Sequence, residues 1–142
     1  MREAYRLAVE ALKYDEVPVG AIVVRKNQII GRGFNQIRSS GDPTAHAEII
    51  ALRDAASRVG NYRLPYADIF VTIEPCTMCA GALVHARIRK LYFATPEPRS
   101  GAVTSTAQVL DNQSLNHRVQ YEQGLCESDC AQLIRDFFAA KR

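Results

Sequence analysis

Two short motifs rich in potential metal ligands constrain this chain more than any other feature. The first is Pro43–Glu48 (PTAHAE), which runs into the apolar stretch Ile49–Leu52; the second is Glu74–Cys79 (EPCTMC), which also leads into an apolar stretch. Together they supply one imidazole, two thiols and a spare carboxylate, the residue types of an open zinc site with its own proton shuttle. A chain that uses both motifs at one ion must fold so that two helix starts converge.

The spacing within the motifs suits a tetrahedral zinc site. Cys76 and Cys79 are three residues apart, so on a helix both thiols lie on one face and can reach the same ion. The partial positive charge at a helix N-terminus favours thiolate over thiol. Two thiolates and the neutral imidazole of His46 leave a fourth position for water, and Glu48 is well placed to take the proton of that water.

Each motif alone has a simpler interpretation. The cysteine pair is also compatible with a redox dithiol or with two inert buried thiols. Glu48 could be an ordinary first-turn carboxylate stabilised by the helix dipole, which is worth a few tenths of a kcal/mol to about one. The presence of both motifs favours zinc. Cys126 and Cys130 have no other cysteine or histidine close in sequence, so free thiols are a better interpretation there than a second metal site.

Composition places the chain among globular proteins. Its 142 residues are 47% hydrophobic and 23% charged, so we expect one domain over residues 1–142. The net charge of +3 is compatible with nucleic acid without indicating it. No apolar run approaches a membrane span and the first residues start no signal peptide, so we expect no membrane partner and a cytoplasmic location.

Hydrophobic periodicity predicts a three-layer α/β/α fold with a central sheet of about five strands and helices on both faces. Helices are expected over Glu3–Lys13, Thr44–Val59 with Thr44 as N-cap, Cys76–Ala86, Thr104–Leu110 and Ser128–Ala140. Strands are expected over Val17–Arg25, Ile29–Phe34, Asp68–Ile73, Lys90–Thr95 and Arg118–Glu122. The first two strands should form a hairpin, the third and fourth should be parallel, and residues 35–42 should form a polar loop.

The two motifs together resemble the signature of the zinc-dependent cytidine and deoxycytidylate deaminase superfamily. Over nearly the whole chain the sequence is also similar to the bacterial tRNA adenosine deaminases, which convert the wobble adenosine of the anticodon to inosine. The segments that carry this resemblance are Glu16–Gly20, Gly33–Asn35, Asp42–Glu48, Asn61–Leu64, Glu74–Ala82 and Asn116–Arg118.

The resemblance implies a homodimeric zinc hydrolase that acts on a tRNA anticodon stem-loop. Matched by position, the zinc ligands would be His46, Cys76 and Cys79, and Glu48 would be the proton shuttle.

The resemblance also implies a set of substrate-binding residues. Asn35 would hydrogen-bond the target base, Val17 and Ala47 would wall its pocket, and the loop with Glu97 would contact the flanking nucleotide. Glu97 stands where family members often have aspartate, and the N-terminus is shorter than usual.

The residues leave two other functions open. One is a free-base or nucleoside deaminase acting on guanine or cytosine. The other is a catalytically idle, zinc-stabilised RNA-binding subunit, against which Glu48 argues, because a structural zinc site has no use for a water and its base.

Some basic and aromatic positions suit either RNA contact or an ordinary surface. These are residues 85–90, Lys141–Arg142 and one of Phe137 and Phe138. His85 and His117 are expected to be surface or capping residues.

Overall fold

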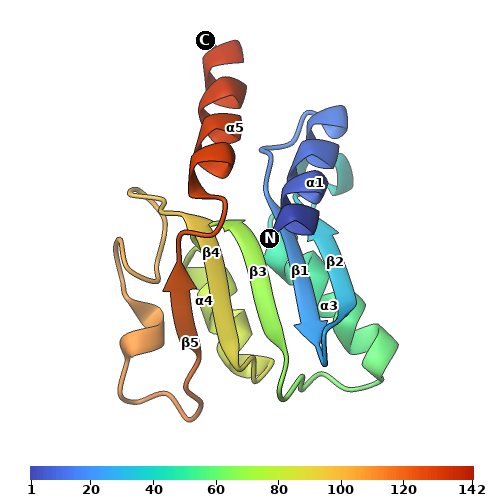
Figure 1. The fold of residues 1–142 in the computed structure, drawn as a ribbon, viewed down its shortest axis with the longest axis vertical. Helices are drawn as coiled ribbons and strands as arrows, with labels where there is room; N and C mark the ends of the chain where they lie inside the picture. The colour runs from blue at the N-terminus through green and yellow to red at the C-terminus, as the bar shows by residue number, and fades with distance from the viewer.

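A five-stranded mixed sheet forms the centre of the computed structural model, which describes residues 1–142 (Figure 1). In spatial order the strands are β2 (Gln28–Phe34), β1 (Gly20–Arg25), β3 (Asp68–Ile73), β4 (Lys90–Thr95) and β5 (Gln120–Gln123). The strand β1 is antiparallel to both β2 and β3, whereas β3, β4 and β5 run parallel. The predicted hairpin and the predicted parallel pair are both confirmed, and the carboxyl ends of β3 and β4 therefore share one edge of the sheet.

Helices cover both faces of this sheet, as the three-layer prediction requires. They are α1 (Arg2–Ala11), the short α2 (Ile37–Ser40), α3 (Ala47–Val59), α4 (Thr77–His85) and α5 (Glu127–Ala140). Figure 1 shows α1 and α5 on one face, with α3 and α4 on the other. None of these helices combines the length and the apolar character needed to span a membrane.

The contact between α3 and β2 is unusually close because both surfaces carry small residues. A Cβ on Gly33 would lie less than 3.0 Å from the carbonyl oxygen of Ala47 and the amide nitrogen of Ala51. Only glycine permits such an approach of strand and helix backbones. This contact fixes the first turn of α3, and with it His46, beside the end of β2 at Asn35.

Several predicted boundaries are wrong near the candidate site. The first strand begins at Gly20 instead of Val17, because the Val19 N–H donates to the Val17 carbonyl in a tight turn. Residues 35–42 contain the short helix α2. The N-cap of α3 is His46 instead of Thr44, whose N–H and hydroxyl both donate to Asp42 Oδ1.

The helix predicted over Thr104–Leu110 is also wrong. Only a single 3₁₀ turn forms in this region, η2 (Val109–Asp111). The main-chain N–H groups of Thr104 and Ser105 donate to the Glu74 carboxylate, at 2.7 and 2.9 Å. A long-range acceptor therefore holds these residues in a loop, where the local sequence favoured a helix.

Candidate active site

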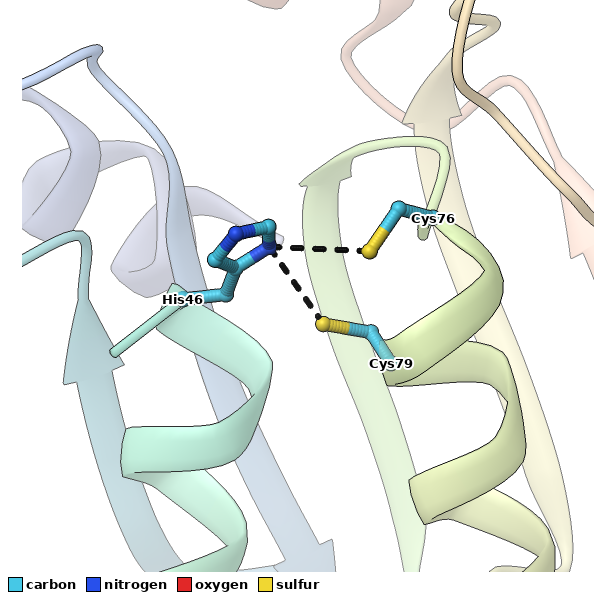
Figure 2. Close-up of side chains that lie close together, drawn as sticks. All are labelled: His46, Cys76 and Cys79. Atoms are coloured by element: carbon cyan, nitrogen blue, oxygen red, sulfur yellow. Dashed lines mark hydrogen bonds between the residues drawn. The ribbon is translucent and has the colours of Figure 1, made fainter. Parts of the chain in front are cut away.

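Two helix N-termini bring the candidate metal ligands together at the carboxyl edge of the sheet. His46 is the N-cap of α3, Cys76 is the N-cap of α4, and Cys79 lies in the first turn of α4. Figure 2 shows the three side chains pointing toward one another from the two helices. The Nδ1 atom of His46 lies 3.6 Å from the Sγ of Cys76 and 3.6 Å from the Sγ of Cys79.

The donor set and its spacing fit a zinc ion. The three donor atoms lie within 4.8 Å of one another. Zinc bonds of about 2.05 Å to nitrogen and about 2.3 Å to sulfur, at a tetrahedral angle, place the nitrogen and the sulfur about 3.6 Å apart. The observed nitrogen–sulfur distances match this tetrahedral edge, so His46, Cys76 and Cys79 could hold zinc with little rearrangement.

The electrostatics of the cluster favour a thiolate. A hydrogen bond with the Cys79 thiol, supported by His46, lowers the pKa of Cys76 to about 4. The same bond to Cys76, together with burial and the nearby Glu48, raises the pKa of Cys79. The Cys76 sulfur also raises the pKa of His46. Binding a metal ion to both sulfurs requires the Cys79 thiol to lose its proton, so metal binding would be coupled to proton release.

Glu48 is a buried carboxyl group beside the cluster. It is the second residue of α3 and only 3% exposed. Burial, reinforced by the Cys76 charge, raises its pKa to about 7, although its own main-chain N–H opposes this shift. An ordinary first-turn carboxylate would be exposed and ionised. A buried carboxyl that titrates near neutral pH is instead suited to accept and return a proton.

A cavity of about 220 Å³ opens beside these residues. Among the residues predicted for the site, its wall includes Val17, Asn35, His46, Glu48, Cys76 and Glu97. The structure therefore brings most of the predicted residues together around one hollow. Cys79 and Ala47 are fully buried and do not line it.

The side-chain amide of Asn35 uses its oxygen within the protein and leaves its nitrogen without a protein partner. It is 6% exposed at the end of β2, and its Oδ1 accepts a hydrogen bond of 2.9 Å from the Ala47 N–H. This bond ties the end of β2 to the first residue of α3 and fixes the orientation of the amide. The Asn35 amide nitrogen donates to no protein acceptor, so it can donate to a base in the cavity.

The sequence did not predict that Glu74 organises the loop beside the site. Its carboxylate is 3% exposed and accepts hydrogen bonds from the main-chain N–H groups of Glu97, Val103, Thr104 and Ser105. Burial works against the charge, but these bonds and the Ser105 hydroxyl lower its pKa to about 2. The only local signal was an acidic residue at the end of an apolar strand, directly before the Pro-Cys pair.

Five further residues of the cavity wall were not predicted as site residues: Val19, Ile73, Ser100, Ile134 and Phe138. Phe138 was recognised only as one of two phenylalanines on the last helix. A groove of about 750 Å³ shares Glu97, Ser100, Ile134 and Phe138 with the cavity. Its other lining residues include Arg99, Arg135, Lys141 and Arg142. The cavity therefore opens into a groove with an excess of positive charge.

The remaining candidate residues lie outside this cluster. Cys126 and Cys130 are free and neither joins a group of potential metal ligands. His85 is exposed. His117 is half-buried, and its Nε2 lies 2.7 Å from the carbonyl oxygen of Ile88, a residue of the turn between α4 and β4, so it caps no helix.

Comparisons with known proteins agree with this site. The MafB19-like deaminase family matches residues 1–142. A tRNA-specific adenosine deaminase of Haemophilus influenzae is 43% identical, covering 100% of this chain and 83% of the relative. One from Agrobacterium fabrum is 45% identical, covering 90% and 84%. A solved structure from studies of A-to-I editing by tRNA:A34 deaminases has a TM-score of 0.91 at 43% identity, covering 94% of this chain and 96% of the other.

The sheet, the two convergent helix starts and the His-Cys-Cys cluster define the class, an enzyme with the cytidine deaminase-like α/β fold. Within the MafB19-like deaminases, the chain belongs to the family of the tRNA-specific adenosine deaminases.

Proposed function

We propose that this protein converts the wobble adenosine of a tRNA anticodon to inosine as a zinc-dependent deaminase, with residues 1–142 acting as one domain. The observation that carries the proposal is the cavity in which His46 and Cys76 lie beside the buried Glu48. The relatives named above support the choice of tRNA as substrate.

In this proposal the chain holds zinc through His46, Cys76 and Cys79. When bound, zinc would act as a Lewis acid that lowers the pKa of a water at the open fourth position. Glu48 takes a proton from the attacking water, passes it to the ring nitrogen of adenine, and then helps to protonate the departing amino group. One water is consumed and one ammonia is released for each inosine formed.

The cavity wall positions the base for this chemistry. Val17, Ile134 and Phe138 provide apolar surface that excludes water around the ring. The free amide nitrogen of Asn35 donates a hydrogen bond to the base, while Ala47 contributes indirectly by holding the Asn35 oxygen. A base in a single-stranded loop can enter such a pocket with less loss of stacking and pairing than a base in a duplex.

The groove beyond the cavity fits the rest of the anticodon loop. Glu97 lines both the cavity and the groove, so it lies where the nucleotide flanking the target would pass. Arg99, Arg135 and Arg142 line the groove without a carboxylate partner and provide the positive charge that a phosphate backbone needs, whereas Lys141 is paired with Asp15. Phe138 offers a ring on which a base can stack.

We also propose that the enzyme is a cytoplasmic homodimer. An apolar hollow of about 340 Å³ lies on the surface of α3 and α4, lined by residues that include Ile49, Leu52 and Ala82. Covering such a surface with a second copy would remove apolar area from water. Analytical ultracentrifugation measures the mass in solution, and a monomer at micromolar concentration would reject the dimer.

A direct test of the function is to incubate the zinc-loaded protein with an anticodon stem-loop and with matched free adenosine, guanine and cytidine. We expect ammonia release and adenosine read as guanosine in cDNA only for the stem-loop. Turnover of the free bases or nucleosides with an unchanged stem-loop would favour the small-molecule deaminase. RNA binding without any ammonia release would favour the idle subunit.

A further inference from the structure

A second polar hollow, of about 590 Å³, lies at the opposite end of the sheet from His46. Its lining includes Arg63, Arg87, Arg89, Arg118 and His117. These residues come from the segment before β3, the turn before β4 and the approach to β5, all at the amino ends of the three parallel strands (Figure 1). A six-residue strand such as β3 spans about 20 Å, so this hollow is separate from the cavity at the carboxyl ends.

The positive charge of this hollow is largely uncompensated. Arg89 forms a two-pronged pair with Asp68, with N–O distances of 2.8 and 2.6 Å. Arg63, Arg87 and Arg118 form no ion pair with any carboxylate. The whole chain carries a net charge of only +3, so three unpaired guanidinium groups around one hollow produce a concentrated positive potential.

Part of this surface is held rigidly and part is free to meet a ligand. Arg87 donates to the Val84 carbonyl at 2.9 Å and to Asn116 Oδ1 at 3.4 Å. His117 is fixed by its contact with the Ile88 carbonyl. Arg63 and Arg118 are exposed; Arg118 donates to the side-chain Oε1 of Gln113, and neither arginine bonds to a carboxylate or to a main-chain carbonyl. Arg87 and His117 thus give the hollow a fixed floor, and the two exposed arginines can close on a ligand.

An exposed tyrosine lies beside the arginines: Tyr66 lines the hollow and is 77% exposed. The Arg63 guanidinium is 5.5 Å from the ring centroid of Tyr62, which lines the apolar hollow on α3 and α4 instead. Guanidinium groups bind phosphate with paired hydrogen bonds, and aromatic rings stack on bases. A surface that offers both, with no carboxylate in its lining, fits a nucleic-acid backbone better than a metal ion or an apolar partner.

We propose that this hollow is a second RNA-binding site that holds the phosphate backbone of the tRNA outside its anticodon stem-loop. The inference rests on the proposed function. The hollow and the catalytic cavity are about one strand length apart. An RNA molecule with its target nucleotide in the cavity can therefore contact the hollow only through another segment of its chain. The hollow therefore contributes to affinity for the whole tRNA and not to the chemistry on the base.

The test uses the double variant Arg63→Gln/Arg118→Gln, which removes the two exposed guanidinium groups that have no carboxylate partner and leaves the structural Arg87 and Arg89 in place. For full-length tRNA we expect a KM and a Kd raised about fivefold to tenfold, with kcat unchanged. The slope of log Kd against log salt should fall by about two, one for each lost phosphate contact. For the isolated anticodon stem-loop, KM and Kd should stay within twofold of wild type.

A matched control is Arg6→Gln/Arg58→Gln, which removes the same charge from arginines paired with Glu3 and Asp54 on other surfaces. An equal loss of tRNA affinity in the control would show that the effect comes from net charge alone and would overturn the proposed RNA-binding site. Unchanged tRNA binding in Arg63→Gln/Arg118→Gln would also overturn it, and so would an equal loss on the stem-loop. If the wild-type protein bound tRNA but did not deaminate it, the proposed function would be rejected. The salt dependence of tRNA binding by wild type and variant would still show whether the hollow binds RNA.

Discussion

Gly101 lies directly against the carboxylate of Glu74: a Cβ on Gly101 would come closer than 3.0 Å to Glu74 Cδ and Oε2. The neighbouring main chains are also joined, because Cys76 and Gly101 form an isolated antiparallel bridge and the Ala102 N–H donates to the Pro75 carbonyl. The turn that presents a candidate zinc ligand and the loop that carries Glu97 therefore form one unit.

We expect Gly101→Ala to push the loop that carries Glu97 away from the turn that contains Glu74 and Cys76. The added methyl group must displace the Glu74 carboxylate, and overpacking of this kind destabilises by about 1–3 kcal/mol. Because Glu97 moves with the loop, deamination of an anticodon stem-loop should fall at least tenfold. Urea unfolding and initial rates measure the two effects. The control is Gly81→Ala in α4, where a Cβ meets nothing within 4 Å and the helix should gain about 0.5–1 kcal/mol. Equal behaviour of the two variants would contradict the steric argument.

Glu74 should also make stability depend on acid pH. Its pKa is about 2 in the folded protein against an ordinary value of 4.5, so the folded state favours the carboxylate. This contribution, about 3 kcal/mol for such a shift, is fully present above the ordinary pKa and is lost as the pH falls toward 2. Urea unfolding at several pH values measures it. The difference between wild type and Glu74→Gln should be largest near neutral pH and shrink in acid; a difference independent of pH would refute the assignment.

Replacing Cys76 or Cys79 by alanine should remove the bound zinc. Metal binding stabilises only the folded state, so both variants should also unfold at lower temperature. Elemental analysis of the purified proteins and thermal melts test this. Cys126→Ala and Cys130→Ala are the matched controls and should keep a full complement of zinc. Zinc retained in both ligand variants would rule out the proposed centre.

Glu48→Gln should keep the fold and the zinc but reduce kcat by roughly 10²–10⁴, the usual contribution of an acid–base residue. The amide has the shape of the carboxyl group but cannot accept and return a proton. Rapid-quench turnover on a stem-loop measures the loss, and Glu3→Gln in the first turn of α1 is the control for an ordinary helix carboxylate. A rate within tenfold of wild type would end the proton-shuttle assignment.

Asn35 offers a test that separates structure from recognition. Asn35→Asp keeps an oxygen to accept from the Ala47 N–H but loses the amide donor, whereas Asn35→Ala loses both. We expect both variants to lose deamination and only Asn35→Ala to lose about 1 kcal/mol of stability as well. Affinity for tRNA should change little in either, because most contacts to RNA go to its backbone. An Asn35→Asp enzyme with normal turnover would remove Asn35 from base recognition.

The sequence by itself determined the parts of this protein that depend on short spacings. The third and fourth strands lie at Asp68–Ile73 and Lys90–Thr95, as their apolar runs predict. The grouping of His46 with Cys76 and Cys79 also followed from the two motifs. These features are legible in the sequence because the periodicity of helices and strands is set within a few residues.

Only the tertiary structure decided the role of Glu74 and the failure of the helix predicted over Thr104–Leu110. The residues whose N–H groups meet the Glu74 carboxylate are 23 to 31 positions away in the chain. The basic hollow at the far end of the sheet is likewise built from three separate segments. The packing of the whole chain determines which distant groups come into contact. A buried carboxylate must be hydrogen-bonded, and its donors are the N–H groups that the fold places beside it, which need not belong to its neighbours in sequence.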